Sequence, residues 1–355
     1  MGSRRSFLRS WSSPLSLFVV VVALAASSAD GFKAPRVPCY FIFGDSLYDS
    51  GNNNNLNTSV KVNYSPYGID FPAGPTGRFS NGRTAADIIG ETLGFKDFIP
   101  PFASNPDDRQ ILVGVNYASG SAGILVESGK QGVGDNVDLN KQLRNHKVTV
   151  SRIVKKLGSK KAAFEHLGQC LYICNMGNND YINNYILPQS TAIRSQYNPA
   201  QFAALLIARY SAQINRMYEL GARKVALAGI SNIGCTPSLI ATVGTNGAPC
   251  VTSVNQLVAP FNIGLKSLIS QLKSAHPDAK FGYLDTIRAG ILASQAFKVK
   301  TTPCCQVSTV TGLCLPNTVP CSQRRSYLFW DAFHPTELAN RLGAPILFPV
   351  IQRIL

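Results

Sequence analysis

Three short polar segments each follow an apolar, strand-like run and contain the residue types that nucleophilic catalysis needs. They are Gly44-Asp45-Ser46-Leu47, Ser119-Gly120 and Gly177-Asn178-Asn179-Asp180. In open parallel sheets, ligands bind beyond the carboxyl ends of the strands, so polar residues at these positions are candidates for a site. The segments supply one hydroxyl nucleophile, Ser46, and two candidate donors to an oxyanion, the Gly120 N–H and the Asn179 amide.

A serine nucleophile needs a base, and the chain has four histidines, His146, His166, His276 and His334. His146 and His166 lie in or beside a long basic helical region, away from the strand ends. His276 stands in a His-Pro-Asp sequence where a helix is expected to end. His334 follows Asp331 by three residues, a spacing that lets the carboxylate reach the imidazole within one tight turn and fix its tautomer. Elimination and spacing together select His334 as the base and Asp331 as its orienting group.

Apolar strand-like runs alternate with segments of helical periodicity from residue 37 to the end of the chain. Strands are expected at 37–43, 111–117, 170–176, 224–228 and 280–284, and helices at 84–93, 137–157, 201–220, 254–275, 286–297 and from 336 onward. Near-continuous apolar strands separated by helices predict a parallel sheet that is covered on both faces. The expected fold class is therefore α/β, with three layers (α/β/α) and a mainly parallel sheet. Because no repeat or long linker divides residues 30–355, we expect a single domain there.

The composition excludes several classes of protein. The 355 residues include 34 Lys+Arg and 19 Asp+Glu, a net charge of +15, although only 15% of residues are charged. A hydrophobic content of 45% excludes intrinsic disorder, and the 21 Pro and 29 Gly lack the period of collagen. No apolar run reaches the roughly 18–20 residues of a membrane span, so no transmembrane segment is expected. The basic residues are spread along the chain with one cluster over 147–161, which we interpret as a solvated helix face and not as a nucleic-acid site.

Residues 1–29 have the pattern of a secretory signal peptide. A basic start with three arginines precedes an apolar stretch at 15–26 and small residues at 27–29, where cleavage is expected. We therefore expect a secreted, extracellular protein. Cleavage removes three basic residues and no acidic one, which leaves a net charge of +12. Such a charge favours electrostatic contact with an acidic cell wall through long-range attraction.

All nine cysteines follow this segment, and a secreted chain can oxidise them. Disulfides are expected within the crowded stretch that holds Cys304, Cys305, Cys314 and Cys321, because it lacks the spacing and the histidine of a zinc site. A further pair is expected between Cys235 and Cys250, which bracket a loop rich in Gly, Thr and Pro. Cys170 and Cys174 lie in an apolar run and are expected to be buried thiols. An odd count leaves at least one thiol free.

Two glycosylation sequons, at Asn57 and Asn63, fall in a polar stretch typical of a surface loop. No metal or cofactor is expected, because the histidines are dispersed. The chain also has neither a phosphate-binding Gly-Lys-Ser/Thr loop nor a dinucleotide-binding glycine pattern after a strand.

Five motif blocks resemble, in content and order, those of the plant-type GDSL esterase/lipase family of the SGNH hydrolase superfamily. They are FIFGDSLYDSGNN (41–53), GRFSNGR (77–83), VNYASGSAG (115–123), MGNNDY (176–181) and DAFHP (331–335). Together they span nearly the whole chain after the signal peptide. The third block departs from the usual pattern at Tyr117 and Ser121, neither of which is a catalytic position.

This resemblance implies a flavodoxin-like SGNH hydrolase fold and hydrolysis of carboxylic esters through an acyl-serine. Ser46 would be the nucleophile, His334 the general base and Asp331 its orienter. The Gly120 N–H and the Asn179 amide would join the Ser46 N–H in the oxyanion hole. The substrate would be a small-molecule, lipid or polysaccharide ester, and no cofactor is implied.

Two alternatives stay open at this point. The same acyl-serine can be resolved by a substrate hydroxyl, which would make the protein an extracellular acyltransferase. A catalytically silent binding protein could also keep the fold, although its usual signature, loss of Ser46, Asp331 or His334, is missing because all three are present. The acyl and alcohol parts of the substrate depend on loops, which carry no readable code.

Overall fold

Four short apolar strands form a parallel sheet in the part of the chain that the structure describes. The structure is a computed structural model, and it describes residues 1–2, 34–130, 132–187 and 191–355. The strands lie in the order β1 (Tyr40–Gly44), β2 (Leu171–Asn175), β3 (Lys224–Ala228) and β4 (Lys280–Leu284). Their first residues are register partners, so all four strands end at one edge of the sheet. The expected strands at 224–228 and 280–284 are confirmed, and the other two are shorter than expected.

The expected strand at 111–117 is wrong in its first half. Gln110–Val113 form the short helix α3, and the chain then runs parallel to β1 along its free edge. Ile42 of β1 donates its N–H to the Val115 carbonyl (3.1 Å), and its own carbonyl accepts the N–H of Tyr117 (2.7 Å). Gly114 makes this turn possible, because its φ of +143° is unfavourable for other residues and a Cβ there would meet the β1 backbone.

This edge segment defines the topology of the sheet. Counted as second along the chain, it places the extended segments in the order 2-1-3-4-5, which is the flavodoxin-like doubly wound order. In such folds the ligand crevice lies beyond the carboxyl ends of the strands, where the chain winding reverses beside β1. The expected α/β fold with a parallel sheet is confirmed.

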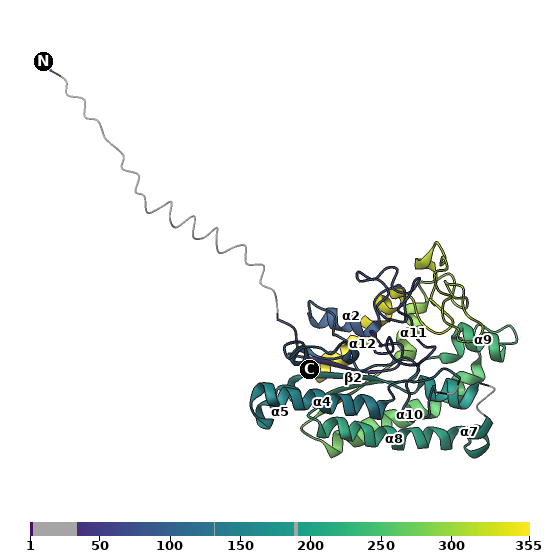
Figure 1. Cartoon of the computed structure of the whole chain (residues 1–355), viewed down its shortest axis with the longest axis horizontal. Coiled ribbons are helices and arrows are strands. Elements are labelled where there is room, and N and C mark those ends of the chain that lie inside the picture. The colour runs from purple at the N-terminus through teal and green to yellow at the C-terminus, as the bar shows by residue number, and fades with distance from the viewer. Residues whose placement is uncertain (3–33, 131, 188–190) are drawn as a thin grey trace. The chain divides into compact units, whose positions relative to one another are not determined.

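Long helices cover both faces of the sheet (Figure 1). On one face lie α4 (Leu139–Leu157), α8 (Pro199–Glu219) and α10 (Thr252–Ala275), and on the other α2 (Ala85–Leu93), α11 (Thr286–Ser294) and α12 (Glu337–Ile354). Besides α3, the other helices are η1 (Phe102–Ser104), α5 (Lys160–Gln169), α6 (Asn178–Tyr181), η2 (Ile182–Ile186), α7 (Thr191–Gln196), η4 (Ile233–Cys235), α9 (Pro237–Val243) and η5 (Arg324–Ser326). No helix among the described residues is long and apolar enough to cross a bilayer. The expected signal peptide at 1–29 lies, apart from its first two residues, outside the described residues.

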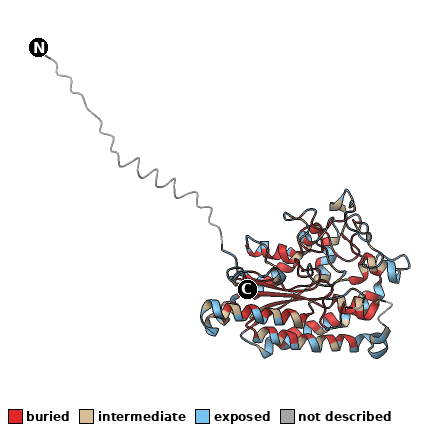
Figure 2. Ribbon diagram, in the orientation of Figure 1, coloured by how far each residue is buried: buried red, intermediate tan, exposed pale blue. Residues whose placement is uncertain are grey.

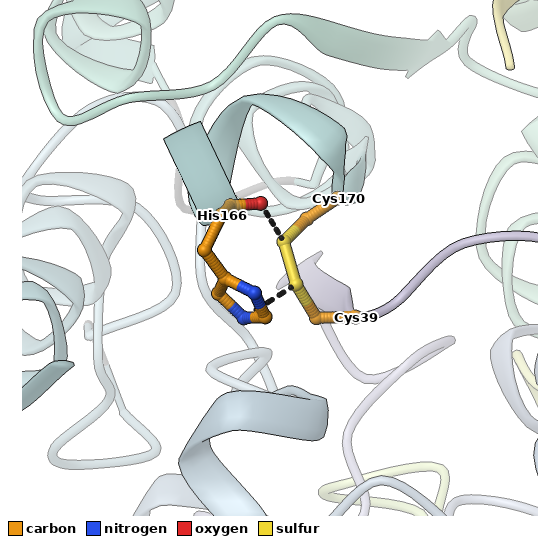
Figure 3. A group of neighbouring side chains, drawn as sticks. All are labelled: Cys39, His166 and Cys170. Atoms are coloured by element: carbon orange, nitrogen blue, oxygen red, sulfur yellow. Dashed lines mark hydrogen bonds between the residues drawn. A yellow bond between two sulfur atoms is a disulfide. The ribbon is translucent and has the colours of Figure 1, made fainter. Parts of the chain in front are cut away.

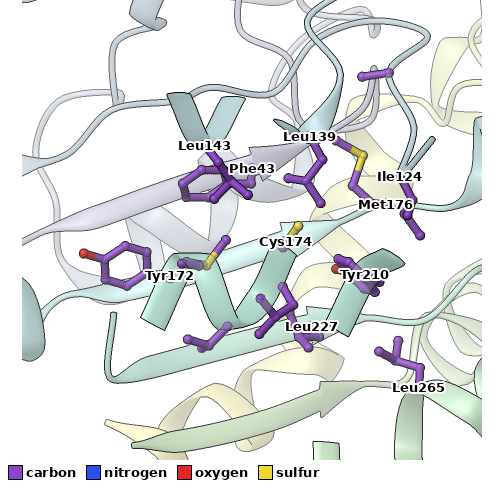
Figure 4. Packing of buried hydrophobic residues seen from close by; sticks show 14 of the residues in the cluster. Phe43, Ile124, Leu139, Leu143, Tyr172, Cys174, Met176, Tyr210, Leu227 and Leu265 are labelled. Carbon is purple, nitrogen blue, oxygen red and sulfur yellow. The ribbon is translucent and has the colours of Figure 1, made fainter. Parts of the chain in front are cut away.

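The strands are apolar along their length because successive side chains enter different layers. Phe41 and Phe43 of β1 belong to the hydrophobic core beneath α4, α8 and α10, whereas Tyr40 and Ile42 pack in the core under α2 and α12. Figure 2 shows the buried strands between helices that are exposed on their outer sides. Figure 4 shows the first core, where Phe43 of β1 and Leu143 of α4 lie together. Burial of each such side chain contributes about 1.5–3 kcal/mol.

Polar side chains set the starts of the helices that approach the sheet edge. Thr84 and Asp87 form a reciprocal capping box at the start of α2. Thr336 accepts the N–H of Ala339 and begins α12 two residues after His334. The turn that carries His334 is therefore held on its C-terminal side by a helix start.

Three of the disulfides lie where the sequence predicted pairing. They are Cys235–Cys250, Cys304–Cys321 and Cys305–Cys314. Cys174 is a buried free thiol, as expected.

The expectation for Cys170 is wrong, because it forms a disulfide with Cys39 (Figure 3). The two cysteines immediately precede β1 and β2, and Leu171 donates its N–H to the Cys39 carbonyl (3.0 Å). The parallel register thus brings together two residues that are 131 positions apart. His166 packs against this pair with its Nε2 3.2 Å from the Cys39 Sγ. Because the two sulfurs are bonded to each other, the group lacks the thiolates that a metal site of this kind requires.

Candidate active site

Ser46 lies in the tight turn that follows β1. Its neighbour Asp45 stabilises the turn, because the Asp45 carbonyl accepts the N–H groups of Tyr48 and Asp49 (both 3.1 Å). The Asp45 carboxylate also accepts the Leu47 N–H (3.0 Å). These bonds hold the turn after β1, and the Ser46 side chain takes part in none of them.

Gln142 of α4 holds the end of β1 from below. Its Oε1 accepts the Gly44 N–H (3.0 Å), and its Nε2 donates to the Gly44 carbonyl (2.8 Å). The Gln142 side chain is fully buried. The Gln142 amide thus binds both backbone groups of Gly44, two residues before Ser46, and positions the turn that follows β1.

His334 and Asp331 approach Ser46 from the loop before α12. The Ser46 Oγ lies 2.7 Å from the His334 Nε2, and the other ring nitrogen, Nδ1, lies 2.9 and 2.8 Å from the two Asp331 carboxylate oxygens. Asp331 also accepts the backbone N–H of His334 (2.8 Å), so one carboxylate holds both the ring and the main chain of the histidine. Ser46 is 8% exposed, His334 5% and Asp331 0%, which leaves the serine end of this series nearest to solvent.

Aromatic side chains fix the position of the imidazole. The Phe79 ring lies over His334 with 4.9 Å between ring centroids. The backbone N–H of Trp330 donates to the His334 carbonyl (2.7 Å), and the Trp330 side chain is fully buried. Phe79 belongs to the second motif block, so this block packs on the histidine.

Asn179 lies at the start of α6, directly after β2. Its Nδ2 donates to the Ala122 carbonyl (3.0 Å), and its Oδ1 accepts from Asn183 (3.2 Å). One N–H of the Asn179 amide is therefore bonded to the third motif block. Because an amide NH₂ has two N–H groups, the other remains as a donor. The adjacent Asn178 donates to the Asp45 carboxylate (2.8 Å) and so ties this segment to the Ser46 turn.

The Gly120 N–H, which the sequence suggests as a donor to an oxyanion, already has a hydrogen-bond partner in the structure. Its N–H donates to the Asp49 carboxylate at 2.9 Å and is not directed to open space. Asp49 also accepts the N–H groups of Gly51 and Asn52 (both 2.7 Å). A Cβ at Gly120 would overlap the Phe79 ring and the Asn53 amide, so only glycine fits at this position.

Three buried carboxylates surround the site: Asp45, Asp49 and Asp180. Burial raises the pKa of each to about 6, although hydrogen bonds from neighbouring N–H and O–H groups oppose this change. Asp180 accepts the N–H groups of Ile124 and Leu125 (2.8 and 2.9 Å) and thereby joins the segment that follows the third motif block to α6. Asp45 joins the Ser46 turn to α6 through the Asn178 side chain, and Asp49 joins the same turn to Gly120.

The other histidines have structural partners. His146 is fully buried under the sheet, 3.1 Å from the Tyr117 hydroxyl, and burial lowers its pKa to about 3. His276 donates its Nε2–H to the Asn215 Oδ1 (2.7 Å) and stacks on the Tyr218 ring. The contacts of His166 are with the Cys39–Cys170 disulfide and a backbone carbonyl. Of the four histidines, His334 is the one hydrogen-bonded to Ser46.

Several residues of the site carry no sequence signal of their own. Asp49 and Asn178 lie inside motif blocks, so the resemblance locates them but not their partners. Gln142 and Tyr67 stand outside all five blocks, and their importance emerges only from contacts across the fold. Tyr67 donates its hydroxyl to Asp331 (2.6 Å).

A serine, a histidine and an aspartate in hydrogen-bonded series at the carboxyl edge of a parallel sheet are the arrangement of an α/β serine hydrolase. A model of the GDSL-like lipase/acylhydrolase family matches residues 40–344. The chain is 44% identical over 342 residues to the Arabidopsis thaliana protein GDSL esterase/lipase At1g29670, covering 94% of this chain and 92% of the relative. It is 45% identical over 345 residues to GDSL esterase/lipase At1g29660 of the same plant, with the same coverage. The chain belongs to the GDSL-like lipase/acylhydrolase family and is a carboxylic ester hydrolase.

Proposed function

We propose that this enzyme cleaves its ester in two steps through an acyl group carried on Ser46. The observation that supports this mechanism is the 2.7 Å contact between the Ser46 Oγ and the His334 Nε2, with Asp331 on the other side of the ring. His334 takes the Ser46 proton as the Oγ attacks the ester carbonyl carbon, and a tetrahedral oxyanion forms. His334 then returns the proton to the departing alcohol, and the acyl-serine remains.

The second step reverses the roles with water in place of the alcohol. His334 accepts a proton from water as the water oxygen attacks the acyl carbon. The proton then goes to the Ser46 Oγ, and the carboxylic acid is released. Asp331 stays ionised throughout and keeps the imidazole Nδ1–H directed at itself, so that Nε2 faces the serine.

The oxyanion of both steps needs preorganised donors. The proposed donors are the Ser46 N–H, the second N–H of the Asn179 amide and the Gly120 N–H. The Gly120 N–H is bonded to Asp49 in the free enzyme, so its participation requires it to turn from this carboxylate to the substrate oxygen. Loss of one such donor typically costs about 10²–10³ in rate.

The mechanism is tested by labelling the purified protein with a fluorophosphonate and locating the label by peptide mass spectrometry. Hydrolysis of p-nitrophenyl acetate and butyrate is compared between wild type and Ser46→Ala. Label on Ser46 alone and loss of turnover in the variant are expected. A folded protein that takes no label contradicts the mechanism and favours a binding protein. Transfer of the acyl group to an added alcohol, with little free acid formed, favours the acyltransferase alternative.

We further propose that the chain is exported, cleaved after residue 29 and glycosylated as a single domain from residue 30. Asn57 and Asn63 both have exposed side chains, which an oligosaccharide requires. Amino-terminal sequencing of the secreted protein is expected to begin at Asp30. Glycopeptide mass spectrometry with and without a glycosidase reports which asparagine is modified, and an unmodified secreted protein contradicts the glycosylation proposal.

We also propose that the protein is retained on an acidic cell wall through its basic side chains. Helix α4 has no acidic residue, and the outer surface of α4 and α5 exposes a cluster of basic side chains: Arg144, Lys147, Lys155, Lys156, Lys160 and Lys161. Because screening acts within about 10 Å at 0.1 M salt, a polyanion is expected to bind at low salt. Elution from a pectin matrix below about 50 mM salt contradicts this retention. Charge reversal at Lys155, Lys156 and Lys160 is compared with the same charge change at Lys273, Lys298 and Lys300, which are also exposed.

A further inference from the structure

Tyr67 makes the closest side-chain contact to Asp331 from outside the serine–histidine series. Its hydroxyl donates to the Asp331 Oδ2 at 2.6 Å, and the residue is 1% exposed. The same Asp331 oxygen lies 2.8 Å from the His334 Nδ1. One carboxylate oxygen thus receives two hydrogen bonds, one from the catalytic ring and one from a phenol that is 264 residues away in sequence.

The Tyr67 oxygen is itself held from the opposite side. It accepts the backbone N–H of Cys314 at 3.0 Å, and Cys314 is joined to Cys305 by a disulfide. The nearby Tyr64 donates its hydroxyl to the Cys314 carbonyl (2.8 Å), so both backbone groups of Cys314 are bound by tyrosines. Cys305, Cys314, Tyr67 and Trp330 share one small hydrophobic core beside the site.

These contacts form a continuous series. The Cys314 N–H donates to the Tyr67 oxygen, the Tyr67 hydroxyl donates to Asp331, and Asp331 accepts the His334 ring. His334 in turn faces Ser46. A donor whose own oxygen accepts a hydrogen bond is polarised and becomes a stronger donor, so each link supports the next.

We propose that Tyr67 is a positioning residue of this active site, and that it couples the Cys305–Cys314 loop to the orientation of Asp331. The inference rests on the proposed function, because Asp331 needs a fixed orientation only if His334 works as the base. With both carboxylate oxygens occupied, Asp331 cannot rotate without breaking either the Tyr67 bond or the bonds to the His334 ring. Burial and the neighbouring Asp331 charge raise the pKa of the Tyr67 phenol well above its ordinary value, so the hydroxyl stays a donor at working pH.

The central test compares Tyr67→Phe with Tyr64→Phe. Each variant loses one hydroxyl that contacts Cys314, but only Tyr67 reaches Asp331. For p-nitrophenyl butyrate we expect kcat to fall about tenfold in Tyr67→Phe with KM within about twofold, because a hydrogen bond to a charged group is lost. Tyr64→Phe is expected to keep kcat within about twofold.

A spectroscopic readout separates positioning from general loosening. The low-field proton resonance of the His334 Nδ1–H is expected to shift in Tyr67→Phe and to stay in place in Tyr64→Phe. Wild-type kcat and an unshifted resonance in Tyr67→Phe overturn the proposal, and so does an equal loss of kcat in both variants. If Tyr67→Phe does not fold, as judged by circular dichroism, 3-fluorotyrosine at position 67 keeps the ring and hydroxyl while making the phenol more acidic. An unshifted resonance in that protein also overturns the proposal.

The coupling to the loop has its own experiment. Joint replacement of Cys305 and Cys314 by serine removes the disulfide but leaves Tyr67 and Asp331 unchanged. A lower kcat, a shifted His334 resonance and an unchanged KM are expected, and wild-type values for kcat and the resonance overturn the coupling. Failure of the proposed function is recognised separately, because wild-type enzyme would then take no fluorophosphonate label at Ser46.

Discussion

The Asp49 carboxylate binds the backbone N–H of Gly120 at a distance of 2.9 Å. Asp49 follows Ser46 by three residues, whereas Gly120 comes from the segment at the free edge of β1. The bond therefore joins the turn of the proposed nucleophile to one of the proposed oxyanion donors. It also means that this donor has a partner before any substrate arrives, and that the substrate oxygen has to compete with a carboxylate.

Replacement of Asp49 tests this relationship. Asp49→Ala leaves three N–H groups, those of Gly51, Asn52 and Gly120, without an acceptor, and we expect the unfolding free energy to fall by about 1–3 kcal/mol. Although the variant removes a competitor for the Gly120 N–H, it also removes the bond that positions this donor beside the Ser46 turn, so we expect kcat to fall by about 10². Asp49→Asn keeps one acceptor oxygen and removes the charge, so kcat is expected to stay within about tenfold of wild type. Steady-state kinetics and chemical denaturation measure both effects. Wild-type kcat in Asp49→Ala would show that the bond has no catalytic role.

Much of the fold could be predicted from local patterns. The strands at 224–228 and 280–284 are short apolar runs between helical segments, and a buried parallel strand has this appearance because both of its faces are covered. The strand expected at 111–117 is wrong at its start, since Gln110–Val113 is apolar in part and short enough to fit either structure. Periodicity does not separate a buried strand from a single helical turn at this length.

The site was predictable where residue types are scarce and unpredictable where partners depend on register. Four histidines and one Asp-x-x-His spacing led to His334 and Asp331, and the structure brings both into hydrogen-bonded series with Ser46. The Cys39–Cys170 disulfide and the Tyr67–Asp331 bond join residues 131 and 264 positions apart. Nothing local marks such pairs, because they become neighbours only when the strands have paired and the loops have packed.

The amide of Asn179 provides a second test of the proposed oxyanion hole. Asn179→Ala removes the donor that lies directly after β2, and we expect kcat to fall about 10²–10³-fold with little change in KM, because the donor acts on the charge of the transition state. Asn183→Ala is the matched control, since Asn183 donates to the Asn179 oxygen (3.2 Å) and is expected to change kcat by less than tenfold. Equal losses in both variants would assign Asn179 a structural role.

A buried ion pair between Arg78 and Asp87 gives a prediction for stability. Arg78 donates two hydrogen bonds to Asp87 (2.8 and 2.9 Å) and lies over the Phe71 ring, 4.2 Å from its centroid. Although burial alone would raise it, the charge of Arg78 lowers the pKa of Asp87. Asp87→Ala leaves a buried cation unpaired and is expected to lower the unfolding free energy by about 3–5 kcal/mol at pH 7.

The exposed pair Arg216–Glu219 is the control for this effect, because Glu219→Ala is expected to cost less than about 1 kcal/mol. The pH dependence adds a further check. Since the folded pKa of Asp87 is below its unfolded value, its contribution is complete above about pH 4 and is lost as the pH falls through the folded pKa. Denaturation curves at pH 7 and at acidic pH should therefore show a smaller difference between wild type and Asp87→Ala in acid.

Asp180 is expected to affect stability in the opposite direction. Burial raises its pKa to about 6 in the folded protein, against about 3.9 in an unfolded chain. Between these values the folded state keeps a proton that the unfolded state has lost, so the contribution of Asp180 to stability decreases as the pH rises from about 4 to about 6. Asp180→Asn removes this titration. Relative to wild type, the variant is expected to gain about 1–3 kcal/mol on going from pH 4 to pH 8, on top of a constant cost for the hydrogen bonds that an amide cannot accept. Urea denaturation of both proteins across this range measures the difference, and a gap that does not vary with pH would mean that Asp180 ionises alike in the folded and unfolded states.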